Sequence, residues 1–176
     1  MSLKLTVQKI NYQYFLNYLL FTLLLSYNIL SSLFKIDDIS TLKINGGHYV
    51  AVKKNDKWAI AYAVKPKLLT GYMYDDFVRV DNDWDYDIYK VKSFGKTGYI
   101  YMDIRNPEYC NFDYVPAIYD DAAKLNEDIY KVKETDKWAV YKVSAKKTVT
   151  LFVYDDITYR NDKLQGLQNG TWVDIE

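Results

Sequence analysis

The chain has 176 residues, with 23 basic and 23 acidic side chains, so its formal net charge is zero. A protein that neutralises nucleic-acid phosphates is normally basic, and this balance argues against nucleic acid as a partner. The single cysteine excludes an internal disulfide, and the 19 tyrosines, against 7 phenylalanines and 4 tryptophans, are typical of strands.

The first 36 residues form an apolar segment unlike the rest of the chain. Residues 10–34 carry no charge, and the densest part, residues 14–34, is 21 residues long. As a helix it would measure about 31 Å, close to the thickness of a bilayer core. Lys4 and Lys9 precede it, while Asp37 and Asp38 follow, a bias that keeps the N-terminus in the cytoplasm. The segment is predicted to be an uncleaved signal anchor, with a cleaved signal peptide or a buried helix as alternatives.

Residues 37–47 are expected to connect this segment to a folded β domain over residues 48–176. That domain repeats a pattern of strand, short polar turn and second strand over residues 49–62, 88–101 and 128–141, with a truncated copy at 167–175. Val52, Val91 and Val132 lie 39 and 41 residues apart. A fixed period near 40 residues predicts a repeat architecture of about three and a half units. Asn169-Gly170 is the best two-residue hairpin turn, because both residues accept a positive φ.

Particular residue types recur at fixed places in the units. A tryptophan just after the turn is predicted to pack between units, and a Tyr-Asp-Asp further on is predicted to end a third strand. Alternation of tyrosine and valine with lysine in the first hairpin strand predicts one core face and one lysine-lined solvent face. These repeat positions are Trp58, Trp138 and Trp172, and Tyr74, Tyr119 and Tyr154.

Residues 95–100, Gly-Lys-Thr-Gly-Tyr-Ile, and residues 116–120, Pro-Ala-Ile-Tyr-Asp, resemble the WG-repeat (KWG-repeat) proteins of bacteria. Lys57-Trp58-Ala59 and Lys137-Trp138-Ala139 keep the tryptophan of that motif and lack its glycine, so the chain resembles a diverged member over residues 48–176. The resemblance implies an all-β repeat fold, often exported, with binding roles and no catalytic residues to transfer.

The most acidic segment is residues 81–87, in which aspartates alternate with other residues. Asp81, Asp83 and Asp85 are weak candidates for metal ligands, because Tyr86 and Lys92 occupy the places where a calcium loop needs glycine and glutamate. The favoured interpretation is an acidic loop between units. The repeated Tyr-Asp-Asp is interpreted as structural, its aspartates capping turns through their own backbone. No cofactor is expected.

Tyrosines on the predicted strands are the remaining candidates for binding, because exposed aromatic rings anchor protein interfaces and stack on sugars. We therefore expect an all-β, non-catalytic interaction or scaffold protein, anchored by residues 10–34, that faces out of the cytoplasm as an accessory to a membrane or envelope complex. The alternative is an exported carbohydrate- or surface-binding module with a cleaved signal peptide, and an enzyme is the least favoured class. The candidate binding residues are Tyr62, Tyr72, Tyr99, Tyr101 and Tyr141.

Overall fold

A computed structural model describes residues 38–40, 49–62, 64–65, 67–82, 85–160 and 162–175. These residues are almost entirely antiparallel β-strands, which confirms the predicted all-β class; the one helical element among them is the short 3-10 helix η1 (Pro107–Tyr109). The predicted span at residues 10–34 lies outside the described residues. Among the residues that the structure does describe, no helix has the length and apolar character of a membrane span. The chain divides into two compact units, and the second begins at Met73 within the described part.

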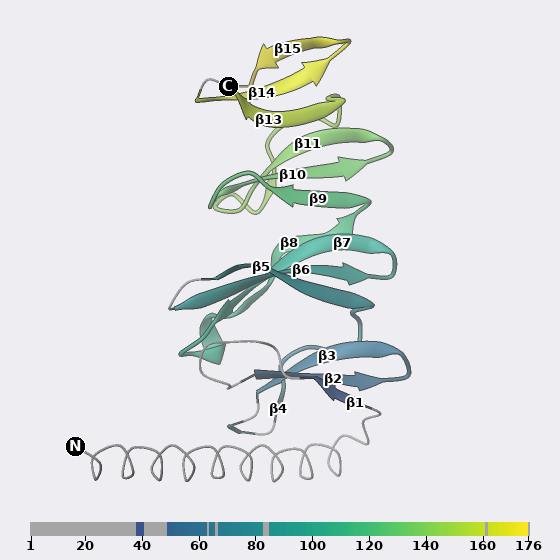
Figure 1. Cartoon of the computed structure of the whole chain (residues 1–176), viewed down its shortest axis with the longest axis vertical. Helices are drawn as coiled ribbons and strands as arrows, with labels where there is room; N and C mark the ends of the chain where they lie inside the picture. The colour runs from purple at the N-terminus through teal and green to yellow at the C-terminus, as the bar shows by residue number, and fades with distance from the viewer. Residues whose placement is uncertain are drawn as a thin grey trace, which may run out of the picture. The chain divides into compact units, whose positions relative to one another are not determined.

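The first unit holds one sheet of four strands in the order β1-β2-β3-β4 (Figure 1). The apolar residues of β2 and β3 form its core, because the first four residues of β2 and the middle of β3 are buried. The bounds are β1 (Asp38–Ser40), β2 (Tyr49–Lys54), β3 (Lys57–Tyr62) and β4 (Lys67–Leu68).

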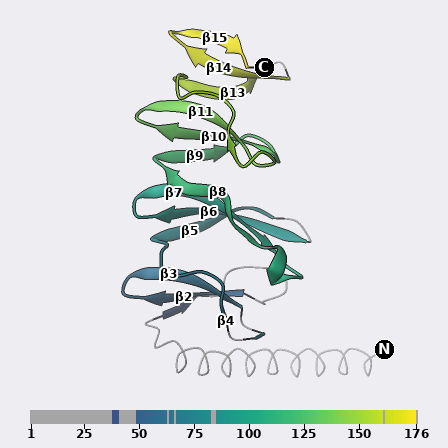
Figure 2. The same cartoon turned by 180° about the vertical axis from the view of Figure 1, so that it is seen from behind.

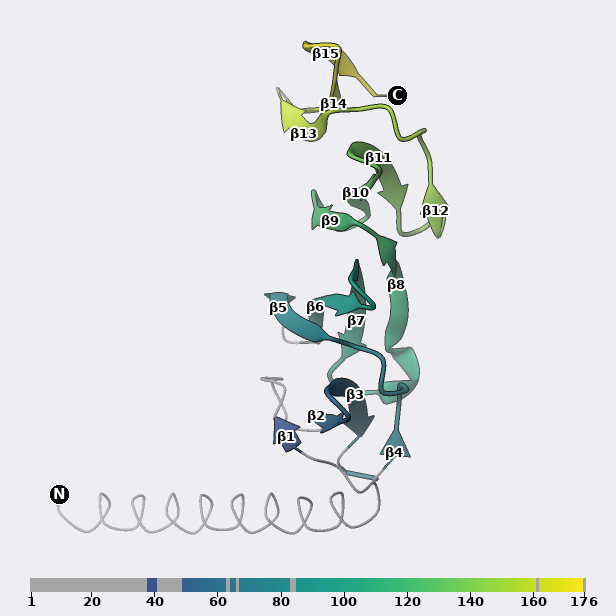
Figure 3. The ribbon, with the colours of Figure 1, turned by 90° about the vertical axis from the view of Figure 1, so that its right-hand side faces the viewer.

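The second unit contains three sheets, each built around one hairpin. Its hairpins β6–β7 and β10–β11 point to the same side, as Figures 1 and 2 show from opposite directions. In the side view of Figure 3 the opening strands β5, β9 and β13 lie on one side of their sheets and β8 and β12 lie on the other. The strands, sheet by sheet, are β5 (Asp76–Asn82), β6 (Tyr86–Ser93), β7 (Lys96–Asp103) and β8 (Asn111–Tyr119); β9 (Asp121–Lys124), β10 (Ile129–Glu134), β11 (Lys137–Lys142) and β12 (Lys147–Thr148); and β13 (Asp156–Arg160), β14 (Lys163–Gln168) and β15 (Thr171–Asp174).

The hairpins β2–β3, β6–β7, β10–β11 and β14–β15 each close with a two-residue turn in which both residues have positive φ, as the primed hairpin turns require. The predicted turn at Asn169-Gly170 is confirmed, with φ of 52° and 77°. The other turns are Asn55-Asp56, Phe94-Gly95 and Thr135-Asp136. Phe94 and Thr135 adopt φ of 51° and 48°, a conformation that costs free energy for an aromatic or β-branched residue.

The sequence pattern predicts that each Tyr-Asp-Asp ends the third strand of its own unit, and this prediction is wrong for the aspartates. Instead the second aspartate is the first residue of β5, β9 and β13, so each acid pair opens the next sheet. Strand alternation alone cannot place this boundary, because sheet membership depends on backbone pairing with the hairpin that follows. The sheets therefore have four, four and three strands in the second unit.

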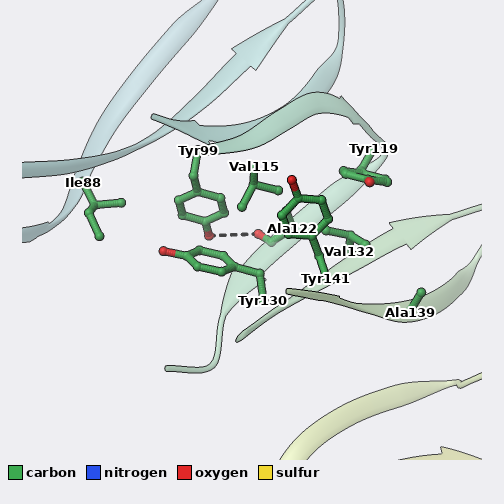
Figure 4. Close-up of a cluster of buried hydrophobic side chains, with 9 residues drawn as sticks. All are labelled: Ile88, Tyr99, Val115, Tyr119, Ala122, Tyr130, Val132, Ala139 and Tyr141. Atoms are coloured by element: carbon green, nitrogen blue, oxygen red, sulfur yellow. Dashed lines mark hydrogen bonds between the residues drawn. The ribbon is translucent and has the colours of Figure 1, made fainter. Parts of the chain in front are cut away.

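The core of the second unit lies between the sheet of β5–β8 and the sheet of β9–β12 (Figure 4). Tyr99 on β7 reaches across this space, and its hydroxyl donates a hydrogen bond to the carbonyl oxygen of Ala122 on β9 over 3.1 Å. Tyr130 and Val132 on β10 are buried there, which confirms the core side of the predicted alternation. The buried cluster comprises Ile88, Tyr99, Val115, Tyr119, Ala122, Tyr130, Val132, Ala139 and Tyr141.

Candidate interaction surface

The five tyrosines predicted to bind a partner do not form one surface. Tyr99 and Tyr141 are 3% and 2% exposed, so they belong to the core, and their assignment as candidate binding residues is corrected. They are buried because their strands are sandwiched by neighbouring sheets, a relation that strand alternation does not reveal. Tyr62 and Tyr72 are half-buried in the first unit, and Tyr101 is half-buried in the second.

Tyr101 nevertheless belongs to a surface row of tyrosines, made of Tyr86 on β6, Tyr101 on β7 and Tyr114 on β8, all half-buried. We call these three residues the tyrosine row. The ring centroids of Tyr86 and Tyr101 are 5.4 Å apart, with planes inclined by 29°, and those of Tyr101 and Tyr114 are 5.6 Å apart, with planes inclined by 33°. Tyr114 also packs edge-on against buried Tyr130, with centroids 5.9 Å apart. The row is therefore the rim of the core, held in place by ring contacts.

The register of the hairpin explains why Tyr86 and Tyr101 meet. Ile88 lies opposite Tyr101 and Tyr86 lies opposite Asp103, so the two tyrosines are diagonal neighbours on one face of the sheet. Tyr114 comes from β8, which joins β7 with register shifts after the short η1 segment. The tyrosine row thus depends on one hairpin register and on one irregular strand pairing.

Carboxylates lie near two members of the tyrosine row, Tyr101 and Tyr114. Burial raises the pKa of Tyr101, and the charges of Asp103 and Asp85 raise it further. Burial also raises the pKa of Tyr114, whose hydroxyl donates to the carbonyl oxygen of Glu127 over 3.1 Å. The row presents uncharged rings beside acidic groups, which suits hydrogen bonding and apolar contact rather than nucleophilic chemistry.

The described ends of the acidic segment belong to paired strands, because residues 81–82 end β5 and residues 86–87 begin β6, so the interpretation of these positions as a loop between units is corrected. Asp81 forms an ion pair with Lys124, and Asp85 forms one with Arg105. Asp83 lies outside the described residues. Within the part of the chain that the structure describes, no three acidic, histidine or cysteine side chains group as metal ligands do. The two described candidates are instead directed at separate cations.

Asp87, the last carboxylate of that segment, has no exposed surface. Its Oδ1 lies 3.5 Å from Nη1 of Arg79, and the hydroxyl of Tyr89 donates to its Oδ2 over 3.4 Å. Burial raises the pKa of the Asp87 carboxyl, against the lowering effects of the Arg79 charge and of these hydrogen bonds. Asp87 is thus a partnered core residue rather than a ligand.

The acid pairs Asp120-Asp121 and Asp155-Asp156 each tie one hairpin to the next. Lys96, just after the β6–β7 turn, donates to Asp120 over 2.7 Å, and Lys90 on β6 donates to Asp121 over 2.9 Å. The other carboxylate oxygen of Asp120 accepts the N–H of Thr135 in the β10–β11 turn over 3.0 Å. One aspartate therefore binds two successive hairpin ends.

The same arrangement follows one repeat later, where Lys137 pairs with Asp155 and Lys131 pairs with Asp156. We call these four Lys–Asp contacts the clamps. The lysine-lined face predicted to contact solvent is therefore partly covered, since Lys90 and Lys131 keep only 33% and 18% of their side-chain exposure. Half-exposed ion pairs contribute at most about 1 kcal/mol each to the stability of the fold. The clamps therefore act mainly by specifying which residues of successive hairpins pair.

Trp138 on β11 pairs through its backbone with Tyr154, just before the acid pair that opens the next sheet, and the packing of the three tryptophan rings between units stays a prediction. The backbone N–H of Trp138 donates to the carbonyl oxygen of Tyr154 over 2.8 Å, and the backbone N–H of Tyr154 donates to the carbonyl oxygen of Trp138 over 3.3 Å. Lys131 Nζ lies 4.8 Å from the centre of the Trp138 ring. Trp58 lies beneath Lys53, at 5.6 Å, and Trp172 beneath Arg160, at 4.8 Å. Each ring thus packs against a cation, a contact worth about 0.5–1 kcal/mol at exposed sites.

Sequence reasoning missed Tyr86 and Tyr114 as members of the surface row. The two-residue turn at Phe94-Gly95 fixes the register of β6 and β7, so it carried enough information to pair Tyr86 with Tyr101. No comparable signal located Tyr114. Comparison of the chain with family models, characterised proteins and solved structures gave no match.

Proposed function

We propose that the chain is a non-catalytic interaction protein that binds a protein partner through the tyrosine row, as an accessory to a larger membrane or envelope assembly. Residues 10–34 would anchor it, with the β domain outside the cytoplasm. We also propose that the β domain is a diverged WG-repeat array, on the residues quoted for that resemblance. The observation that carries the interaction proposal is a preformed row of half-buried, neutral tyrosines beside carboxylates.

The ring geometry favours a protein partner over a sugar. Tyr101 has a tyrosine packed on either side of it across the sheet, on β6 and on β8. Its ring is therefore packed between two other rings, whereas a sugar needs an open aromatic face. Tyrosines held in this way bind at small conformational cost, which is the reason that they are frequent in protein interfaces.

The flanking Asp85 and Asp103 support glycan binding as a second candidate function, because carboxylates accept hydrogen bonds from sugar hydroxyls. In that case the first segment would be cleaved and the β domain would act alone. The outer edges of Tyr86 and Tyr114 would then supply the apolar contact.

The test is affinity purification of the tagged full chain from membranes in mild detergent. A row variant carrying Tyr86→Ser and Tyr101→Ser is compared with a control, Phe94→Ser, which removes an aromatic side chain that is 75% exposed and outside the row. We expect the native chain and the control to retain a protein partner and the row variant to lose it, with all three folded by circular dichroism. Equal recovery with the row variant would contradict the proposal, and row-dependent binding to a glycan array without a protein partner would favour the second candidate.

A further inference from the structure

The short strand β12 and the residues around it carry exposed lysines beside exposed aliphatic side chains. Exposure alternates along residues 147–152, as on an extended segment with one outward face. The outward side chains are Lys147, Val149 and Leu151, and the two aliphatic ones are 47% and 77% exposed. Lys146, which is also exposed, precedes them. We call Lys146, Lys147, Val149 and Leu151 the basic edge.

Hydrogen bonds to the neighbouring chain hold the backbone of the basic edge in place. The N–H of Val140 on β11 donates to Oγ1 of Thr150 over 2.9 Å, and its carbonyl oxygen accepts the N–H of Val149 over 2.8 Å. The loop before the edge is held by the carboxylate of Asp128, which accepts the N–H and the hydroxyl of Ser144 over 2.7 Å and 2.9 Å. The outward side chains therefore stand on a fixed backbone, so a contact made by them costs little backbone ordering.

The two lysines of the basic edge lack the acidic partners that other lysines of this sheet have. Within the described residues, neither Lys146 nor Lys147 forms an ion pair. Burial and the charge of Asp113 on β8 raise the pKa of Tyr141, yet this carboxylate pairs with neither lysine. In a chain with zero net charge, the two lysines are therefore available to an external anion. The paired lysines of the sheet are Lys124, Lys131, Lys133, Lys137 and Lys142.

The first unit carries the same composition at the same place in its own sheet. Strand β4 pairs with the end of β3 in the way that β12 pairs with the end of β11. Lys65 and Lys67 are exposed there and form no ion pair among the residues that the structure describes, and Val64 is 58% exposed. Unpaired lysines beside an exposed aliphatic side chain thus recur in each of the two compact units.

The composition of the basic edge decides between a protein and a lipid as its occupant. Lysine is depleted from protein interfaces, whose anchors are tryptophan, tyrosine and arginine seated in pockets. On an anionic bilayer, by contrast, lysines are attracted to the phosphates while apolar side chains enter the headgroup region. We infer that the basic edge rests on an anionic lipid surface, with Leu151 and Val149 directed into it. This inference rests on the membrane anchoring in the proposed function and adds a second contact with the bilayer.

The expected strength of this contact suits a domain that is already tethered. Each lysine near an anionic surface strengthens binding about fivefold, and removing a leucine side chain from water strengthens it about tenfold. Two lysines and Leu151 together therefore favour an anionic bilayer by about 250-fold. That is too weak to hold a free domain, but an anchor at residues 10–34 in the same bilayer raises the effective concentration of the edge at the surface.

The test uses the purified full chain in nanodiscs, where no other protein can cover the edge. Acetylation by a water-soluble reagent is measured at each lysine by mass spectrometry, in bilayers that contain phosphatidylglycerol or phosphatidylcholine alone. We expect Lys146 and Lys147 to react about fivefold or more slowly on the anionic bilayer. The exposed Lys92 on β6 should react equally on both bilayers. In about 1 M salt, where the Debye length is about 3 Å, the difference should disappear.

A matched pair of variants tests the apolar part of the contact. Leu151→Ser should return Lys146 and Lys147 towards their rates on the neutral bilayer, whereas Phe94→Ser, which also removes an exposed side chain, should leave the protection unchanged. Equal reaction of the two lysines on both bilayers would overturn the inference. Protection in native membranes that is absent from anionic nanodiscs would also overturn it, because the occupant would then be an acidic protein.

These results are separable from the fate of the proposed function. A chain that binds a protein partner through the tyrosine row, and whose two lysines react equally on both bilayers, would refute the basic edge alone. A chain that purifies without any partner, and whose lysines are protected only on the anionic bilayer, would refute the proposed function and leave the basic edge standing.

Discussion

Two tyrosines that touch in the core should respond in opposite directions when each is replaced by phenylalanine. The rings of Tyr99 and Tyr130 have centroids 4.7 Å apart and both are buried. The Tyr99 hydroxyl donates to the carbonyl oxygen of Ala122, whereas the Tyr130 hydroxyl is buried and has no hydrogen-bond partner in the described part of the chain. Both substitutions keep the ring and remove only an oxygen, so neither opens a large cavity.

Tyr99→Phe removes a hydrogen bond between two sheets and leaves a buried carbonyl oxygen with less hydrogen bonding, which should lower the free energy of unfolding by about 1–2 kcal/mol. Tyr130→Phe removes a buried hydroxyl that lacks a partner, which should raise it by about 1 kcal/mol. A domain near 100 residues shifts its Tm by about 4–8 °C per kcal/mol, so the variants should melt about 8 °C or more apart.

The assay is urea unfolding of the full chain in detergent, followed by circular dichroism, with the double variant completing a thermodynamic cycle. If Tyr130→Phe destabilised the chain as much as Tyr99→Phe, the Tyr130 hydroxyl would be satisfied in the native state. The description of the interface between the two sheets would then be wrong.

Three further predictions concern the backbone, a turn and pH. Gly166→Ala should lower the free energy of unfolding by about 1–3 kcal/mol, because a Cβ there meets the ring of Tyr154. The control Gly71→Ala, whose Cβ meets nothing within 4 Å, should change it by less than about 1 kcal/mol. Urea unfolding distinguishes the two variants, and equal effects would contradict the packing of Gly166 against Tyr154. Thr135→Asn should raise the free energy of unfolding by about 1 kcal/mol, and with it the Tm, because it relieves a β-branched residue at φ 48°. A lower Tm in calorimetry would show that the turn is not strained. Burial raises the pKa of several tyrosines from 10.0 to about 12, so the unfolded chain loses these protons first. Stability should be complete below about pH 10 and fall as the pH rises towards about 12, and a free energy of unfolding that stays constant over that range would refute the burial. These tyrosines are Tyr74, Tyr99 and Tyr119.

Local sequence patterns were enough to predict the hairpins but not their grouping into sheets. The turn at Asn169-Gly170 and the alternation around Tyr130 and Val132 depend on residues next to one another, and both are confirmed. The acid pair at Asp120 and Asp121 depends on lysines 24 and 31 residues earlier in the chain. Such long-range contacts cannot be inferred from the alternation of side chains.

The candidate surface illustrates the same limit. Tyr99 and Tyr101 are two residues apart on β7 and look equivalent in sequence, yet only Tyr101 remains partly exposed. The difference arises because Tyr99 reaches across to β9, while Tyr101 lies at the rim beside Tyr86. Exposure was therefore decided by where the neighbouring sheet ends, which the sequence of one strand does not state.

The most direct test of the proposed function is intact-mass analysis of the native full-length protein. The protein is purified from membranes in mild detergent together with any molecule that it binds. We predict a chain that retains residues 1–36 and carries a protein partner in fixed stoichiometry. A shortened, soluble chain that purifies alone would contradict both the anchor and the protein-partner proposal.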